Sequence, residues 1–297
     1  MNILIIGASG FIGNAVLDHF SVNYSVTGID RVGNGAKNIL EAGDFKNTAD
    51  LISKNRFDLI INCAGSSNVS QSVHDPQHDF ELNTVLVQQL LCAIKDHSPK
   101  TKFITISSAA VYGNPSTLPI KENDLPKPLS PYGLHKLVSE ELVSHYSRIY
   151  QLQTLSVRIF SAYGTGLKRQ FFYDLYTKFR NNPNEIELAG TGNESRDFIF
   201  ITDIAEALEV LFQKATFNGE VYNLGSGEES FIAPTAALFA RICGYKGEIR
   251  FNQKQFAGYP LNWKACIGKL SALGFSPKVT LGEGLKNYVD YLKNNKA

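Results

Sequence analysis

The stretch Asn2–Phe20 reads NILIIGASGFIGNAVLDHF and decides the fold. Its first five residues form an apolar, β-branched run that predicts a buried strand. Apolar residues at helical spacing follow over Phe11–Phe20 and predict a helix. Between the two lies a glycine triplet, Gly7, Gly10 and Gly13, with the spacing G-x-x-G-x-x-G. Glycines there permit a tight turn and a close backbone approach, so we expect strand, turn and helix to form one unit.

The same alternation continues through the first two-thirds of the chain. Further strands are predicted at 25–30, 57–62, 102–107 and 154–160, a helix closes at 51–55, longer helices run over 80–97 and 132–150, and the proline-rich segment 115–131 is a loop. Apolar strands that alternate with helices indicate a parallel sheet covered on both faces. The predicted fold class is α/β, a doubly wound parallel sheet of the Rossmann type with a smaller interleaved C-terminal part.

The alternation of strand and helix patterns is interrupted after about Tyr163. The segment 175–180 and the Asn181-Asn182-Pro183-Asn184 run that follows it read as irregular, whereas the alternation resumes within 198–224. We therefore expect residues 1–165 to form a nucleotide-binding domain to which 196–227 returns. Residues 166–297 are expected to form mainly a smaller, substrate-binding domain.

Composition excludes several classes of protein. The 297 residues carry 29 Lys+Arg against 28 Asp+Glu, so the basic excess of a nucleic-acid surface is missing. No apolar run approaches the ~18–20 residues of a membrane span, and no basic region precedes an apolar stretch at the N-terminus. We therefore expect a cytoplasmic protein with no membrane partner. The four scattered cysteines lack metal-ligand spacing, so packed thiols and no metal site are predicted.

The glycine turn and the end of the second strand together indicate a dinucleotide. A helix N-terminus behind such a turn faces a pyrophosphate. Asp30 ends the strand 25–30, where a carboxylate accepts from the hydroxyls of an adenine ribose and repels a 2′-phosphate, which favours NAD over NADP. Two alternatives stay open: Arg31 can bind that phosphate, and Asp30 can be an ordinary turn residue.

Two further segments extend the expected cofactor site. Asp44 follows the third short segment and can accept from the adenine amino group, with Phe45 beside the ring. Cys63-Ala64-Gly65 ends the strand 57–62, and small residues there let a cofactor lie across the strand ends. Ordinary loop chemistry is the alternative for both segments.

A Y-x-x-x-K pattern provides the candidate catalytic groups. Its spacing puts Tyr132 and Lys136 on one helix face, and Ser107 and Ser108 end the strand 102–107 at the same edge of the sheet. A nearby ammonium and a cationic nicotinamide lower a phenol pKa, so Tyr132 can act as general base or acid on a hydroxyl or carbonyl. Ser108 is expected to hydrogen-bond the same substrate oxygen. His135 is expected to face elsewhere.

Taken jointly, these motifs resemble the extended short-chain dehydrogenases/reductases, and specifically the NAD-dependent nucleotide-sugar epimerase/dehydratase family that includes UDP-glucose 4-epimerases. The matching segments are GASGFIG (7–13), Asp30, Gly43-Asp44, CAG (63–65), DPQHDFELN (75–83), SSAAVYG (107–113), SPYGLHK (130–136), VRIFSAYGTG (157–166), RDFIFITDIAEAL (196–208) and VYNLGSG (221–227).

The resemblance implies roles for individual residues. Ser108, Tyr132 and Lys136 carry catalysis, and Arg196 binds the substrate diphosphate as a planar, bidentate donor. The residues expected to contact NAD are Gly7, Gly10, Phe11, Ile12, Gly13, Asp30, Arg31, Asp44, Phe45, Cys63, Ala64, Gly65, Asn83, Ser107, Tyr132 and Lys136. Those expected to contact a nucleotide-diphospho-sugar are Ser66, Ser108, Ser161, Lys168, Arg169 and Arg196. A homodimer through the helices 80–97 and 132–150 is also implied.

Departures from the family pattern narrow the reaction. Ala109 and Ala110 stand where dehydratases carry an acidic pair, so 4,6-dehydration is not expected. Ser161 replaces the usual asparagine after the R-x-F strand. A later arginine of the family is missing, and Lys168, Arg169 or Arg250 are candidates to compensate for it.

Three functions stay open. The first is an NAD-dependent 4-epimerase of a nucleotide sugar. The second is an NAD(P)H-dependent 4-ketoreductase of a 4-keto-6-deoxy nucleotide sugar, which would use the same residues in one direction. The third is a non-catalytic dinucleotide sensor, which the intact set of Ser108, Tyr132 and Lys136 disfavours.

Overall fold

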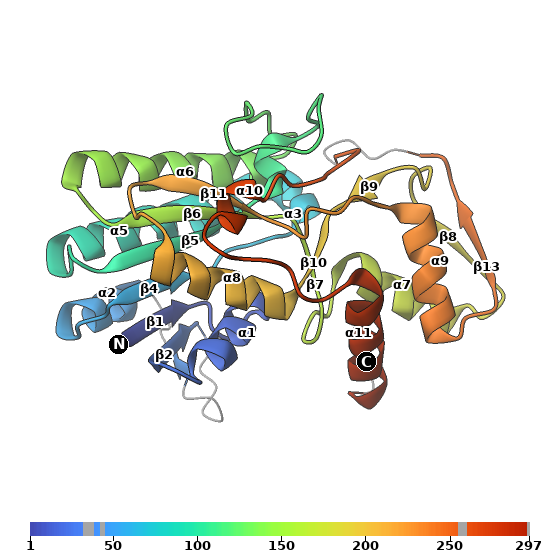
Figure 1. Ribbon diagram of the computed structural model, residues 1–297, viewed down its shortest axis with the longest axis horizontal. Helices are drawn as coiled ribbons and strands as arrows, with labels where there is room; N and C mark the ends of the chain where they lie inside the picture. Colours follow the sequence, from blue (N-terminus) through green and yellow to red (C-terminus); the bar gives the residue numbers. More distant parts are fainter. Residues whose placement is uncertain (32–38, 42–44, 255–259, 296–297) are drawn as a thin grey trace.

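The computed structural model describes residues 1–31, 39–41, 45–254 and 260–295, and its centre is a seven-stranded parallel sheet (Figure 1). The strands, in spatial order, are β11 (Glu220–Leu224), β6 (Thr154–Ile159), β5 (Lys102–Ser108), β4 (Leu59–Asn62), β1 (Asn2–Ile6), β2 (Ser25–Asp30) and β3 (Ile39–Glu41). The predicted α/β fold with a doubly wound parallel sheet is confirmed.

Both faces of the sheet are buried, because successive strand residues point to opposite sides. In β1, Ile3 and Ile5 pack into one apolar core, and Leu4 and Ile6 pack into a second one. The first core contains α1 (Phe11–Phe20) and α8 (Ile201–Lys214), whereas the second contains residues of α2, α5 and α6. Figure 1 shows these two sets of helices on either side of the sheet.

The first part of the chain contains further helical elements besides α1. They are α2 (Phe45–Lys54), α3 (Val69–His74), α4 (Pro76–Phe80), the π-helix η2 (Glu81–Val85), α5 (Leu86–His97), the 3₁₀ turn η3 (Ala109–Tyr112) and α6 (Pro131–Tyr150). The single helix predicted over 80–97 is therefore the end of α4, a π-helical turn and α5. Asp75 caps α4 by accepting from the His78 amide, and Pro76 occupies its first turn.

The later part of the chain forms small elements of its own, of which α7, β8, β9, α9 and β13 lie at the right of Figure 1. They are β7 (Ser161–Tyr163), α7 (Gln170–Asn181), β8 (Glu185–Leu188), β9 (Ser195–Arg196), β10 (Phe198–Phe200), β12 (Ser230–Phe231), α9 (Ile232–Cys243), β13 (Glu248–Phe251), α10 (Gly268–Ser271) and α11 (Leu281–Asn294). β7 pairs with β10, and β11 returns to the main sheet beside β6. The proposed domain limits remain a prediction.

The expectation of an irregular segment at 175–180 is wrong, because α7 covers it. Phe172, Leu175, Tyr176 and Phe179 are buried along one face of that helix, at helical spacing. The polar residues between them and the Asn-Asn-Pro-Asn run that follows hide this period in the sequence.

The strand order reverses between β1 and β4. In open α/β sheets, ligands bind beyond the carboxyl ends of the strands at such a point. The ends of β1, β2, β4 and β5 therefore define the edge at which a site is expected.

Candidate functional site

The glycine turn after β1 leaves no room for side chains. Gly7 has a φ of +78°, and a Cβ there would lie 2.6 Å from the backbone nitrogen of Ala64. A Cβ on Gly13 would clash with the Gly7 carbonyl. The turn is fixed to the neighbouring strand because the amides of Gly7 and Ala8 donate to the Ile29 carbonyl. These contacts bring the backbone of β1, β2 and the segment after β4 together at the start of α1.

Asp30 lies at the end of β2 next to this turn. Its carboxylate accepts from the Ser9 amide at 2.9 Å and from the Arg31 amide at 2.7 Å. These contacts place a negative charge beside the helix N-terminus, while Arg31 itself is exposed. Asp44 lies outside the described residues, and of Phe45 only the backbone position at the start of α2 is described. Their proposed contacts with adenine remain predictions.

Asn83 is buried next to the end of β4 with its amide unpaired. Neither its side-chain oxygen nor its nitrogen has a hydrogen-bond partner among the described residues. A Cβ on Gly65 would lie 2.6 Å from Asn83 Oδ1 and 3.3 Å from Lys136 Nζ. Glycine at this position therefore lets these two polar groups lie close to the chain after β4. Buried amides without partners carry a free-energy penalty, and a ligand with hydroxyl groups would relieve it.

Local structure at the start of α6 brings Tyr132 to Ser108. Ser130 caps the helix by accepting from the Gly133 amide at 3.2 Å. A Cβ on Gly133 would lie 2.6 Å from the Ala110 carbonyl, so only glycine lets the first turn of α6 pack this closely on η3. The Tyr132 phenol comes near enough to the Ser108 hydroxyl for that hydroxyl to lower its pKa.

Burial raises the pKa of Tyr132 to about 12, and the charge of Asp79 raises it further. The hydrogen bond from Ser108 and the charge of Arg169 work in the opposite direction. Activation of Tyr132 as a base therefore needs additional positive charge near the phenol.

Lys136 lies one turn further along α6 than Tyr132. Its Nζ is buried and donates to the Ile106 carbonyl at 3.0 Å. Burial lowers the pKa of Lys136 to about 8, while the charges of Asp79, Cys63 and Glu140 oppose that shift. Cys63 itself is a thiol whose pKa burial raises to about 12, which fits the expected packed cysteine.

A second buried polar group lies behind Lys136 on the same helix face. The Arg158 guanidinium donates to both oxygens of Glu140, with the shortest contact at 2.6 Å, and also to the Tyr112 hydroxyl at 2.7 Å. Tyr112 in turn donates to Asn223 on β11. The Ser107 hydroxyl donates to Glu140, so its side chain is committed to this network, and its contact with the cofactor stays a prediction. We name these five residues the Arg158 cluster.

His135 faces α4, which does not contradict the expectation that it faces away from the candidate catalytic groups. Its Nδ1 lies 2.7 Å from Asp79 Oδ2, and both side chains are buried. Sequence analysis did not single out this pair or Glu140. The position of Glu140 four residues after Lys136, on the same helix face, is a signal that would have found it.

The proposed substrate-binding residues are spread over several elements. Ser66 follows β4 and accepts from the Asn68 amide, and Ser161 begins β7. Lys168 and Arg169 are exposed just before α7, and Arg169 is near enough to act on the Tyr132 charge. Arg250, a candidate to compensate for the missing arginine, instead pairs with Glu185 and Glu248 on the outer side of β8 and β13.

Arg196 is held in place by its neighbours. Its Nη1 donates to the Ser195 carbonyl at 2.7 Å, and its guanidinium lies 5.5 Å from the centre of the Trp263 ring. Asp197 fixes the next loops by accepting from the amides of Ser226, Gly227 and Ala265. In the R-D-F motif, Arg196 thus provides a guanidinium, and Asp197 holds the neighbouring loops together.

Comparison with known proteins identifies the family. The model of the NAD dependent epimerase/dehydratase family matches residues 3–225. The chain belongs to this family. It is 31% identical to a putative UDP-glucose 4-epimerase of Methanocaldococcus jannaschii, with 99% of each chain covered.

Solved structures agree with this assignment. UDP-glucuronic acid 4-epimerase from Bacillus cereus, in complex with UDP-glucuronic acid and NAD, is 30% identical with a TM-score of 0.90, covering 99% of this chain and 100% of that one. UDP-glucose 4-epimerase from Thermotoga maritima, solved with UDP-glucose, is 26% identical with a TM-score of 0.91, and both chains are covered in full. The predictions of an enzyme of this family and of NAD as its cofactor are confirmed.

The residues of this family member fit NAD at the predicted edge. The glycine turn carries no side chain at Gly7, Gly10 or Gly13, so its backbone is open to a close approach, and the buried Asn83 amide beside Lys136 has no partner in the described part of the chain. No group of three or more potential metal ligands occurs within 1–31, 39–41, 45–254 and 260–295. In those same ranges no helix has the length and apolar character that crossing a membrane requires.

Proposed function

We propose that the protein is a 4-epimerase of a UDP-sugar, acting through Tyr132, Ser108 and Lys136. The observation that carries the proposal is the meeting of these three side chains beside the glycine turn and the unpaired amide of Asn83. The UDP-sugar epimerases to which the chain is similar over its full length support it. The choice of UDP and of C4 in this proposal follows those relatives, and the experiment below identifies the sugar.

The reaction follows from the chemistry of these groups. Bound NAD supplies a reversible acceptor of hydride from the sugar C4. Tyr132, as the phenolate, removes the proton of the C4 hydroxyl while hydride leaves C4, and the C–O bond becomes a carbonyl. Ser108 donates to that oxygen and holds it in line. In the second half of the reaction Tyr132 would give the proton back to the C4 oxygen, once the ketosugar has turned its other face toward the place that NAD would occupy.

Lys136 has two proposed tasks. Its ammonium stabilises the Tyr132 phenolate, because a positive charge in a partly dry site favours a nearby anion. It is also close enough to Asn83 for both to hold the hydroxyls of the nicotinamide ribose, and Gly65 leaves the space for that contact. Asp30 and the glycine turn would hold the adenine ribose and the pyrophosphate.

The substrate diphosphate is proposed to lie against Arg196, with Lys168 and Arg169 as further cations. A guanidinium held by backbone carbonyls and an indole ring is pre-oriented for a bidentate contact with phosphate oxygens. Ser66 and Ser161 are proposed to contact the sugar.

Two alanines separate this reaction from dehydration. Ala109 and Ala110 follow Ser108 directly, and neither side chain can move a proton. Elimination of water across C5 and C6 therefore has no acid or base at this position. A 4-ketoreductase would use the same triad in one direction and would consume NADH or NADPH in stoichiometric amounts.

The experiment is to incubate the purified protein with UDP-glucose, UDP-glucuronic acid or UDP-N-acetylglucosamine and to follow the sugars by proton NMR. Approach to one equilibrium mixture from either epimer, without net consumption of cofactor, supports the proposal. Bound NAD, released by acid and counted per chain, is expected near one. Conversion only of a 4-keto-6-deoxy sugar, with NADH or NADPH oxidised, would establish the ketoreductase instead.

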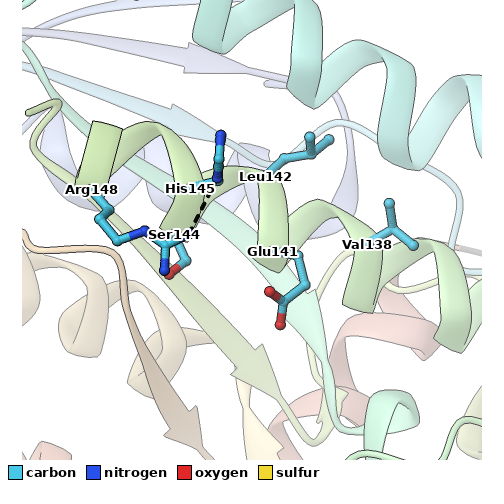
Figure 2. Close-up of a pocket in the computed structure, with 6 residues that line it drawn as sticks. All are labelled: Val138, Glu141, Leu142, Ser144, His145 and Arg148. Carbon is cyan, nitrogen blue, oxygen red and sulfur yellow. Dashed lines mark hydrogen bonds between the residues drawn. The ribbon is translucent and has the colours of Figure 1, made fainter. Parts of the chain in front are cut away.

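The homodimer is a second proposal, and α6 is its surface. Leu134, Val138, Leu142, His145 and Ile149 follow each other at intervals of three or four residues, and Leu134 and Ile149 are exposed. A hollow of about 290 Å³ lies along this helix. Figure 2 shows the side chains that line it, from Val138 to Arg148. An apolar stripe with such a hollow fits the same stripe of a second copy. The mass of the protein by light scattering, with Leu134→Glu as the disrupting variant, tests it.

A further inference from the structure

Asp79 and His135 join two elements that carry different parts of the proposed site. Asp79 lies on α4, four residues before Asn83, and His135 lies on α6 directly before Lys136. Their contact of 2.7 Å is shielded from solvent, since Asp79 is 3% exposed and His135 is 8% exposed. The Phe80 ring packs edge-on against the imidazole, with 5.2 Å between ring centres. A polar contact this dry is strongly directional and does not exchange freely with water.

Neutral hydrogen bonds reinforce the same junction. The Thr84 hydroxyl donates to the His135 carbonyl at 3.0 Å, and the Ser139 hydroxyl lies within hydrogen-bond distance of the carbonyls of both Asn83 and His135. The wide π-helical turn that holds Asn83 is thus attached to α6 at the residue preceding Lys136. A shift of α4 relative to α6 would therefore separate the Asn83 amide from the Lys136 ammonium.

Asp79 also acts on the catalytic groups through its charge. It raises the pKa of Tyr132 and the pKa of Lys136, although each change is smaller than the effect of burial. The other titratable groups that act on these two side chains are Glu140 on α6, Cys63 after β4 and Arg169 before α7. Asp79 is thus the one acidic group that acts on both Tyr132 and Lys136 among the causes found in the described part of the chain.

We propose that Asp79 and His135 are positioning residues of the proposed epimerase: their contact ties the π-helical turn that carries Asn83 to α6, and it thereby holds the Asn83 amide beside Lys136. The proposal rests on the proposed function for its kinetic consequences. Its geometric part concerns the binding of NAD and is independent of the sugar substrate.

The first variant, Asp79→Asn, retains the shape and a hydrogen-bonding group but removes the charge. With the anion gone, Tyr132 and Lys136 both lose a proton more easily, so both limbs of the pH profile of kcat/KM should move to lower pH, by on the order of half a unit to one unit. The matched control is Thr84→Val, which cuts a neutral hydrogen bond to the same junction. Its pH limbs should stay in place even if its rate falls.

The second pair of variants separates position from charge. His135→Asn keeps a donor near the place of Nδ1, whereas His135→Ala removes the contact altogether. We expect His135→Ala to bind NAD at least tenfold more weakly by calorimetry and to lose NAD during purification, and His135→Asn to restore most of that binding. If Asp79→Asn does not fold, this pair of variants still decides the geometric part.

A readout without any sugar substrate keeps the two proposals distinct. The ionisation of Tyr132 can be followed at 295 nm as the difference between the NAD-loaded protein and its Tyr132→Phe variant, and Asp79→Asn should move it to lower pH. Unchanged ionisation in Asp79→Asn together with unchanged NAD affinity in His135→Ala would overturn the positioning role. Failure to convert any UDP-sugar, with these two shifts present, would instead count against the proposed function alone.

Discussion

Two buried polar clusters lie on the same face of α6, and they differ in how completely they are paired. In the Arg158 cluster, Glu140 takes three contacts from the guanidinium, and the remaining groups continue through Tyr112 to Asn223. The second cluster, which we call the strand-end cluster, comprises Ser108, Tyr132, Lys136 and Asn83. There the Asn83 amide has no partner within the described residues.

The difference indicates which buried polar groups stabilise the fold and which are better explained by the binding of a ligand. Removing one partner of a buried, hydrogen-bonded ion pair is strongly destabilising, because it leaves an uncompensated buried charge. A buried amide without partners is destabilising by about 1–3 kcal/mol, so its presence is more easily explained by a bound molecule than by the fold. The two clusters should therefore respond in opposite ways to substitution.

The largest expected effect is on kcat, and it distinguishes Tyr132 of the strand-end cluster from Tyr112 of the Arg158 cluster. Tyr132→Phe removes the proposed base and should lower kcat by about 10³–10⁴-fold with the NAD content unchanged. Tyr112→Phe is the matched control, because it removes a hydroxyl from the Arg158 cluster and should mainly lower the free energy of unfolding, by about 1–3 kcal/mol. Equal losses of kcat in both variants would erase the distinction between the clusters.

The next effect is on stability alone. Glu140→Ala leaves the Arg158 guanidinium buried and without its carboxylate, so the free energy of unfolding should fall by about 3–5 kcal/mol. Chemical denaturation with urea measures it. Glu141→Ala, next to it and lining the outer hollow of α6, provides the control and should stay within about 0.5 kcal/mol of the wild type.

A third prediction uses the pH dependence of stability. Lys136 has a pKa of about 8 in the folded chain, below its ordinary value of 10.5. Between those values the unfolded chain binds more protons, so Lys136 makes the free energy of unfolding rise with pH. Lys136→Met abolishes this contribution. From about pH 8 to about pH 10.5, the protein without NAD should therefore gain about 3 kcal/mol relative to the variant. Parallel curves for the two proteins would contradict the buried position of the ammonium.

The smallest expected effect is a change in the free energy of unfolding of the NAD-free protein, and the sign of that change is what tests the role of Asn83. Asn83→Leu replaces an unpaired amide with an apolar side chain, so the NAD-free protein should become more stable by about 1–2 kcal/mol while NAD is no longer retained. Asn62→Leu is the control, because the Asn62 amide is paired with Thr105 and Ala64 and its loss should destabilise the chain. Thermal unfolding with and without added NAD distinguishes the two.

Several parts of the fold and site were open to prediction from local pattern. The strand, glycine turn and helix of 2–20 were predictable because glycine spacing and apolar period act over a few residues. The Y-x-x-x-K spacing likewise fixes two side chains on one helix face. The helix α7 was missed since its apolar face is interrupted by polar residues, and the π-turn η2 has no signature in the apolar period.

The sequence by itself determined the parallel α/β fold, the edge of the sheet that holds the site, and the identity of Tyr132, Lys136 and Ser108 as a candidate set. Only the tertiary structure decided that His135 meets Asp79, that Ser107 turns to Glu140, and that Asn83 lies unpaired beside Lys136. The His135–Asp79 contact joins residues 56 positions apart in the chain, and the Ser107–Glu140 contact joins residues 33 positions apart. Asn83 and Lys136 likewise come from separate helices. Local spacing sets which side of a helix a residue occupies. The partner that it meets there depends on how separate elements pack, and that is decided by the burial of the whole core.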